Sequence, residues 1–288
     1  MEKKVVLITG SSTGLGLKTS VLLAQNGYKV YATMRNLEKS SELEKETKEQ
    51  NVSIAIKQLD VSDPGSIQKC IAEIFEREGK IDILINNAGA GFLRASEHTS
   101  EEELLHVTDV NYLGVVRCTN AVLSIMRKQK SGHIINISSV GGLVGQPFNE
   151  LYCAAKFAVE GYTEALATYL TPFFRIKFTI VEPGGISTEF ANNVYKTVSP
   201  DAFQEDIYGP ILQQYADSVR KRPKEELERI YQSGEQVAQI IMDCIENENP
   251  PLRARTSKWS NEFCELKTNA DPDGLKLHDR LTKLYWGK

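Results

Sequence analysis

Short apolar segments rich in β-branched residues alternate with longer amphipathic segments from the N-terminus to about residue 182. The short segments have the length of buried strands, and the longer ones have the length and period of helices. We expect strands near residues 4–9, 28–33, 53–59, 82–86, 132–138 and 175–181, and helices near 14–26, 39–49, 64–78, 100–128 and 150–170. This alternation predicts an α/β fold, with a doubly wound parallel sheet between two layers of helices.

The pattern changes after Pro183-Gly184-Gly185. Residues 186–232 contain helical stretches rich in charged and aromatic residues, and we expect no strand between them. A helix over residues 233–246 and a last strand over 252–256 follow. Residues 257–288 form a polar, partly helical extension, which we expect to pack on the same domain.

Composition limits the classes of partner. The 288 residues carry a formal net charge of −4, which gives no electrostatic footprint for nucleic acid, so we expect small-molecule partners. No apolar run reaches the roughly 18 to 20 residues of a membrane helix, and no signal peptide precedes the first strand, so we expect a cytoplasmic protein. The five cysteines and four histidines are scattered, so we expect neither a disulfide framework nor a metal site.

A glycine-rich loop joins the first expected strand to the first helix, with the sequence Thr9-Gly10-Ser11-Ser12-Thr13-Gly14-Leu15-Gly16. Backbone N–H groups at a helix N-terminus bind phosphate, and glycine lets the chain approach it closely. We assign Gly10 to the tight turn, Gly14 to the close approach and Gly16 to the packing of helix on strand. Ser12, Thr13 and Leu15 complete the predicted nucleotide loop.

The triphosphatase loop pattern is absent, because Lys18 follows Gly16 by two residues. A kinase or ATPase would therefore lack its phosphate-binding lysine.

The end of the second strand indicates which dinucleotide binds. Folds that prefer NAD place an acidic residue there to bind the ribose hydroxyls. This chain has Tyr31-Ala32-Thr33-Met34-Arg35-Asn36, with no acid and one arginine. Arg35 is placed to bind a 2′-phosphate, which predicts NADP(H) over NAD(H), although a solvent-facing loop arginine is the alternative.

Tyr152 and Lys156 are four residues apart, thirteen residues after Ser139. If this segment is helical, the ammonium and the phenol share a face. A free tyrosine has a pKa of about 10, and a neighbouring positive charge should lower it toward the range of a useful proton donor. The alternative is an ordinary amphipathic helix with a surface lysine.

Taken in order, these motifs resemble the short-chain dehydrogenase/reductase family. The resemblance rests on the glycine loop, Asn86-Asn87-Ala88-Gly89, Asn111, Ser139, Tyr152, Lys156 and Pro183-Gly184, and covers roughly residues 4–256. Residues 30–35, 109–111 and 139–156 look like the branch of 17β-hydroxysteroid dehydrogenase type 1 and the retinol dehydrogenases. The resemblance implies a Rossmann-like catalytic domain over residues 1–256, with a substrate lid at about 186–232.

The resemblance also implies roles for the matching positions. Tyr152 would be the general acid or base, Lys156 would bind the ribose hydroxyls and lower the tyrosine pKa, Ser139 would bind the substrate carbonyl oxygen, and Asn111 would hold a relay water. The remaining implied cofactor contacts are Asp60, Val61, Asn87, Ala88, Gly89, Pro183, Gly184, Ile186 and Thr188. Ser139, Gly145, Phe148, Asn149 and Phe190 are the implied substrate contacts.

We therefore expect an NADP(H)-dependent oxidoreductase that acts on a lipophilic ketone, aldehyde or alcohol, such as a steroid, retinoid or long-chain carbonyl, and that forms a homodimer or homotetramer. The stretch after residue 188 has enough apolar residues to roof a cleft for such a substrate. It contains no histidine to anchor a distant steroid oxygen. Two alternatives remain, a 3-oxoacyl thioester reductase and a catalytically silent NADPH-sensing or scaffold protein.

Overall fold

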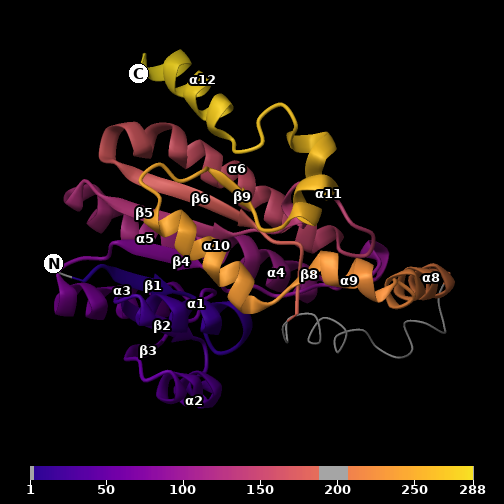
Figure 1. Cartoon of the computed structure of the whole chain (residues 1–288), viewed down its shortest axis with the longest axis horizontal. Coiled ribbons are helices and arrows are strands. Elements are labelled where there is room, and N and C mark those ends of the chain that lie inside the picture. The colour runs from indigo at the N-terminus through magenta and orange to yellow at the C-terminus, as the bar shows by residue number, and fades with distance from the viewer. Residues whose placement is uncertain (1–2, 188–206, 288) are drawn as a thin grey trace.

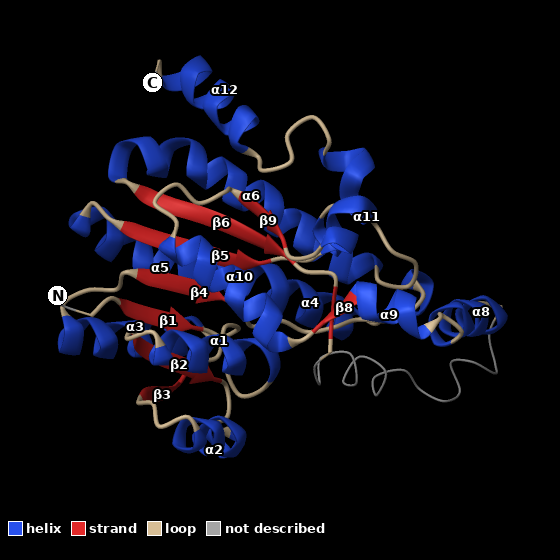
Figure 2. Cartoon of the chain, in the orientation of Figure 1, coloured by secondary structure: helices blue, strands red, loops and turns tan. Residues whose placement is uncertain are grey.

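A seven-stranded parallel sheet forms the centre of the computed structural model, which describes residues 3–187 and 207–287. The strand order is β3-β2-β1-β4-β5-β6-β9, so the order reverses between β1 and β4. The strands are β1 (Val5–Ile8), β2 (Lys29–Met34), β3 (Ile54–Gln58), β4 (Ile83–Asn86), β5 (Gly132–Ile137), β6 (Ile176–Glu182) and β9 (Arg253–Arg255). This arrangement, visible in Figure 2, confirms the predicted three-layer Rossmann-like fold.

Helices cover both faces of the sheet, as Figure 1 shows. One face packs on α3 (Pro64–Glu78), α5 (Gly114–Gln129) and α6 (Glu150–Phe174). The other packs on α1 (Gly14–Gln25), α2 (Ser41–Glu49) and α10 (Gly234–Glu246). Side chains of β1 alternate between these two cores, because successive residues of a strand point to opposite faces.

The remaining helices lie around the end of the sheet where the strands finish and beyond its β9 edge (Figure 1). They are α4 (Glu101–Thr108), α8 (Gly209–Arg220), α9 (Lys224–Ile230), α11 (Lys258–Thr268) and α12 (Leu275–Trp286). Short 3-10 turns occur at Leu37–Lys39, Ser96–His98 and Val140–Gly142. In the described residues, no helix combines the length and apolar character needed to cross a membrane.

The predicted helix over residues 100–128 is interrupted. A π-helical turn at Asp109–Leu113 separates α4 from α5. Its physical cause is the Asn111 side chain, whose Nδ2 donates to the Val107 carbonyl oxygen at 3.0 Å, the acceptor that a regular α-helix would offer to the Asn111 backbone. The sequence pattern could not show this competition between side chain and backbone.

The expectation of no strand in residues 186–232 was also wrong. Two short parallel strands pair there, β7 (Gly185–Ile186) with β8 (Tyr231–Gln232). A Cβ on Gly185 would lie 2.7 Å from the Tyr231 ring, so glycine is required for this approach. Strands of two residues are too short to give a readable alternation.

Candidate active site

A cleft of about 710 Å³ runs along the carboxyl ends of the parallel strands. The loops that follow β1, β2, β4, β5 and β6 all contribute to its walls, as expected at this edge of a doubly wound sheet. Most residues that the sequence analysis assigned to the cofactor line it: Gly10, Ser12, Thr13, Gly14, Leu15, Arg35, Asp60, Val61, Asn87, Ala88, Gly89, Tyr152, Lys156, Pro183, Gly184 and Ile186. Thr188 lies outside the described residues.

The glycine loop forms one end of the cleft. Gly10 and Gly14 have positive φ angles, 70° and 59°, which favour glycine. A Cβ on Gly16 would lie 2.3 Å from the carbonyl oxygen of Gly10, so Gly16 packs directly against the loop rather than facing the cleft. Asn87 Nδ2 donates to the carbonyl oxygens of Thr9 and Gly10 at 2.9 and 2.8 Å. The loop is thus held open at the N-terminus of α1, which fits a phosphate.

Two cations stand beside this loop. Arg35 and Lys39 are both exposed and both line the cleft. Asp60 is the one acid in the described lining, and its carboxylate accepts the Ser62 N–H at 2.9 Å. Arg35 was predicted from the sequence, whereas Lys39, four residues further on, was not. Lys18 is paired elsewhere, at 2.8 Å from Glu46 and 2.9 Å from Glu235.

Ser139, Tyr152 and Lys156 meet at the other end of the cleft. Ser139 follows β5, and its Oγ accepts the Gly141 N–H at 3.0 Å, which fixes the turn that presents it. Tyr152 and Lys156 lie one turn apart on α6, as predicted, with the ammonium 5.6 Å from the ring centroid. Lys156 Nζ is buried and donates to the Ile137 carbonyl oxygen at 2.8 Å.

The expected lowering of the Tyr152 pKa was wrong. Loss of water around the hydroxyl raises the pKa of Tyr152 to about 12, although a hydrogen bond with Ser139 opposes the shift. Burial has the opposite effect on a cation: it lowers the pKa of Lys156 to about 8, and the charge of Glu160 opposes this shift. The reason is geometric: the ammonium lies over the ring and is bonded to Ile137, so desolvation dominates at both groups.

Comparison with known proteins identifies the family. Residues 4–199 match the family described as short chain dehydrogenase. The chain is a short-chain dehydrogenase/reductase.

Curated relatives of this dehydrogenase cover most of its length. It is 38% identical over 275 residues to retinol dehydrogenase 8 of Bos taurus, covering 94% of this chain and 86% of the relative. It is 37% identical to 3-ketodihydrosphingosine reductase of Bacteroides thetaiotaomicron, covering 88% of each chain. It is 35% identical to human 17-beta-hydroxysteroid dehydrogenase type 1, covering 95% of this chain and 83% of the relative.

Solved structures support the same fold. A short-chain dehydrogenase from Streptomyces avermitilis superposes with a TM-score of 0.76 at 27% identity, covering 99% of both chains. Other neighbours of this fold include a serine dehydrogenase complexed with NADP+, at 28% identity and a TM-score of 0.72, and a Burkholderia phymatum dehydrogenase/reductase in complex with NAD, at 22% identity and a TM-score of 0.76. The family resemblance and the Rossmann-like fold predicted from the sequence are therefore confirmed.

In this dehydrogenase, Asn111 lies behind the cleft rather than in it. Its side chain is fully buried, with Oδ1 accepting the Ala90 N–H at 3.1 Å and Nδ2 donating to the Ala90 carbonyl oxygen at 2.8 Å. A Cβ on Gly89 would lie 3.1 Å from Asn111 Oδ1 and 4.0 Å from Lys156 Nζ. The Asn111 amide therefore holds the loop that follows β4, and Gly89 of this loop lies between Asn111 and Lys156.

The implied substrate contacts divide into three groups. Ser139 and Asn149 line the cleft. Gly145 is exposed and does not line the cleft, and Phe148 is buried against Leu93 and Leu212. Phe190 lies outside the described residues.

Several residues that line the cleft were not predicted from the sequence. Gln146, Leu93 and Tyr231 belong to this group, and Tyr215 comes from the apolar stretch after residue 188 that was expected to roof the cleft. Tyr231 reaches the cleft only because β8 pairs with β7.

Proposed function

We propose that this dehydrogenase is an NADP(H)-dependent oxidoreductase that interconverts a lipophilic ketone or aldehyde and the corresponding alcohol. The observation that carries the proposal is the meeting of Ser139, Tyr152 and Lys156 at one end of a cleft whose other end is a phosphate-type glycine loop. A nicotinamide cofactor, when bound, would supply or take up the hydride. Gly14 and the backbone of α1 would hold its phosphates, and Lys156 its ribose hydroxyls.

The side chains at the reaction end can manage the charge on the substrate oxygen. During reduction that oxygen becomes negative, and the Ser139 and Tyr152 hydroxyls are the donors that can stabilise it. A phenol with a pKa of about 12 still gives its proton readily to an alkoxide, which is a stronger base. The Lys156 ammonium, 5.6 Å from the ring centroid, then stabilises the phenolate because the two charges attract each other.

The preference for NADP(H) follows from charge. Arg35 and Lys39 face the cleft beside the glycine loop, whereas no carboxylate stands at the end of β2 to bind a ribose 2′-hydroxyl. Two exposed cations favour a 2′-phosphate, and the arginine can bind it through two hydrogen bonds.

The lipophilic substrate class is supported by the cleft and by the relatives. Leu93, Tyr215 and Tyr231 give the reaction end apolar walls. The names of the relatives, a retinol dehydrogenase, a 17-beta-hydroxysteroid dehydrogenase and a 3-ketodihydrosphingosine reductase, refer to large apolar alcohols or ketones. We extend this class, rather than any one of these substrates, to the present chain.

We also propose a cytoplasmic homodimer or homotetramer. All five cysteines are unpaired, which suits a reducing compartment. Phe157, Tyr169 and Phe173 are exposed apolar side chains at different positions around α6, and Phe173 also packs edge-on against Trp286 of α12. Exposed apolar side chains such as Phe157 are suited to contact with a second copy. Sedimentation at micromolar concentration should give a mass above the 32.2 kDa of one chain, and Phe157→Glu should shift it toward that mass. A wild-type monomer would contradict the assembly.

The enzymatic proposal is tested by following NADPH absorbance with a panel of hydrophobic aldehydes and ketones. Tyr152→Phe removes the proton donor while keeping the ring, and should lower kcat by about 10²- to 10⁴-fold without weakening NADPH binding. Equal rates for wild type and Tyr152→Phe would reject the role of the tyrosine. NADPH binding with no turnover of any carbonyl would favour a sensor protein instead.

A further inference from the structure

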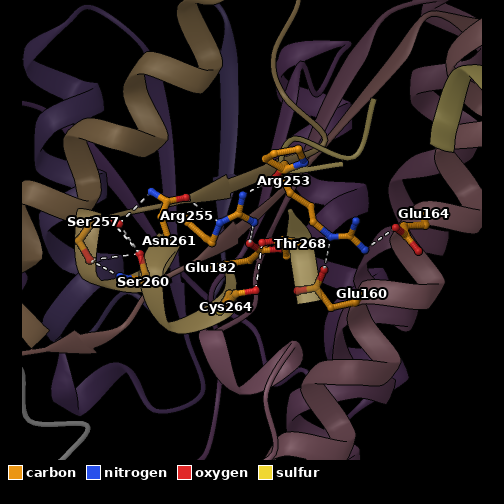
Figure 3. Close-up of polar contacts among 11 residues, drawn as sticks. Glu160, Glu164, Glu182, Arg253, Arg255, Ser257, Ser260, Asn261, Cys264 and Thr268 are labelled. Carbon is orange, nitrogen blue, oxygen red and sulfur yellow. Dashed lines mark hydrogen bonds and ion pairs between the residues drawn. The ribbon is translucent and has the colours of Figure 1, made fainter. Parts of the chain in front are cut away.

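A buried network of acids and arginines continues the catalytic face of α6. Glu160 and Glu164 lie one and two turns beyond Lys156, so the residues at 152, 156, 160 and 164 share one face of the helix. Arg253 of β9 bonds both acids: its Nε lies 3.3 Å from Glu160, and its Nη2 donates to Glu164. Figure 3 shows the Arg253 guanidinium pointing toward these two side chains.

The network extends to the neighbouring strand. Glu182 of β6 is fully buried, 3.3 Å from Arg253 Nε and 2.8 Å from Arg255 Nη1. Three carboxylates thus face two guanidiniums, which leaves the cluster with an excess of acid. Lys156, one turn before Glu160 and itself 4% exposed, is the buried cation next along the helix.

Glu160 also contacts the strand end that carries Ser139. A Cβ added to Gly142 would lie 2.5 Å from Ser138 Oγ and 3.0 Å from Glu160 Oε1, so these two oxygens are neighbours beneath Gly142. Among the described residues, neither oxygen makes a hydrogen bond of ordinary geometry, so the two lie close together without a regular bond between them. Lys156 bonds the carbonyl of Ile137. Two consecutive turns of α6 therefore lie against two consecutive residues at the end of β5: Lys156 bonds Ile137, and Glu160 lies beside Ser138.

We propose that Glu160 is a positioning residue for the reaction. Held by Arg253, its side chain keeps the Ser138–Ser139 strand end in place, and its negative charge, one turn along α6, offsets part of the cost of burying the Lys156 ammonium. Glu160 touches neither the cleft nor the reacting atoms, so it acts through Lys156 and Ser139. This inference rests on the proposed function of the Ser139, Tyr152 and Lys156 group.

The charged and titratable groups around Glu160 come from five elements. They are Lys156 and Glu164 of α6, Glu182 of β6, Arg253 and Arg255 of β9, Cys264 of α11 and the Ser138 hydroxyl after β5. Burial and then the charge of Glu182 raise the pKa of Glu160 well above its usual range, while Ser138 and Arg253 oppose the shift. The negative charge of Glu160 therefore develops toward alkaline pH, where Lys156 also titrates. Removing the carboxylate should leave the Lys156 ammonium with less compensation and lower the pKa of Lys156 further.

The test compares Glu160→Gln with the matched variant Glu164→Gln, which removes an acid from the same arginine at a more exposed site. In carbonyl reduction with NADPH, Glu160→Gln should lower kcat by about tenfold with little change in KM. The alkaline limb of its pH profile should move to lower pH. Glu164→Gln should stay within about twofold of wild type and keep its pH limb. Glu160→Asp, which keeps the charge on a shorter side chain, should restore the position of the limb.

Equal behaviour of Glu160→Gln and Glu164→Gln would overturn the inference, because it would mean that Glu160 is neutral and only fills space. A loss of rate with an unchanged pH limb would also overturn it. If Glu160→Gln does not fold, the comparison of Glu160→Asp with Glu164→Gln decides, and an altered pH limb in Glu160→Asp counts against the role. The affinity for NADP⁺, measured by fluorescence over a range of pH, reports the protonation of Lys156 even if no carbonyl is reduced. Failure of the proposed function can therefore be told apart from failure of this inference.

Discussion

The two ends of the cleft are built from different materials. The glycine-loop end consists of backbone, tight glycine contacts and two exposed cations, Arg35 and Lys39. The reaction end consists of side chains that are partly or fully removed from water and whose charges depend on one another. A steric change should therefore dominate at the first end and an electrostatic change at the second. Variants at each end can test this difference.

The largest expected effect is at Lys156. Lys156→Met removes the ammonium but keeps most of the side-chain volume, and should lower kcat/KM for carbonyl reduction by about 10²-fold or more. Steady-state kinetics over a range of pH would measure it. If kcat/KM of the variant stays within threefold of wild type at every pH, the buried charge at the reaction end is dispensable. The two ends of the cleft would then not differ in the way described.

The stability of the same variant should depend on pH in a defined direction. The pKa of Lys156 falls from 10.5 in the unfolded chain to about 8 in the folded protein. Between these values the unfolded chain binds a proton that the folded protein does not, so wild-type stability rises with pH. Lys156→Met lacks this term. In urea titrations, the free energy of unfolding of Lys156→Met minus that of wild type should fall by about 3 kcal/mol between pH 8 and 10.5. If this difference stays constant over the pH range, Lys156 is not a buried ammonium with a lowered pKa.

Gly16→Ala is the corresponding test at the loop end. The added Cβ would lie 2.3 Å from the Gly10 carbonyl oxygen and 2.5 Å from Asn87 Nδ2, so the loop must move. We expect a loss of about 1–3 kcal/mol of stability, together with weaker NADPH binding. Gly161→Ala is the control of similar chemistry, because no atom lies within 4 Å of its added Cβ and its φ is not positive. Equal affinities in the two variants would show that the loop tolerates displacement.

The smallest expected effects are at the two cations. Arg35→Ala should reduce the preference for NADPH over NADH by about tenfold, and Lys39→Ala by less, because a lysine offers a point charge rather than paired hydrogen bonds. Titration of both cofactors against each variant measures the ratio. An unchanged ratio in Arg35→Ala would remove the argument from charge at this end.

The same contrast explains what the sequence could predict. The parallel sheet, the glycine loop and the Tyr152–Lys156 face follow from local patterns, and the structure confirms their placement. The π-turn at Asn111 and the pairing that brings Tyr231 to the cleft depend on contacts made only in the folded chain. The direction of the Tyr152 pKa shift was missed for a related reason, because spacing along a helix gives proximity but not burial.

The arginine at the end of β9 has a consequence for the last thirty residues. Arg255 has a buried side chain, and besides Glu182 its guanidinium donates to Asn261 Oδ1 at 2.8 Å and to the carbonyl oxygen of Pro272. A chain truncated after Thr256 would strip this cation of both later partners and uncover the sheet edge at once. The C-terminal segment therefore stabilises the β9 edge of the sheet. Its removal should lower the free energy of unfolding of the whole domain, although none of its residues takes part in the reaction.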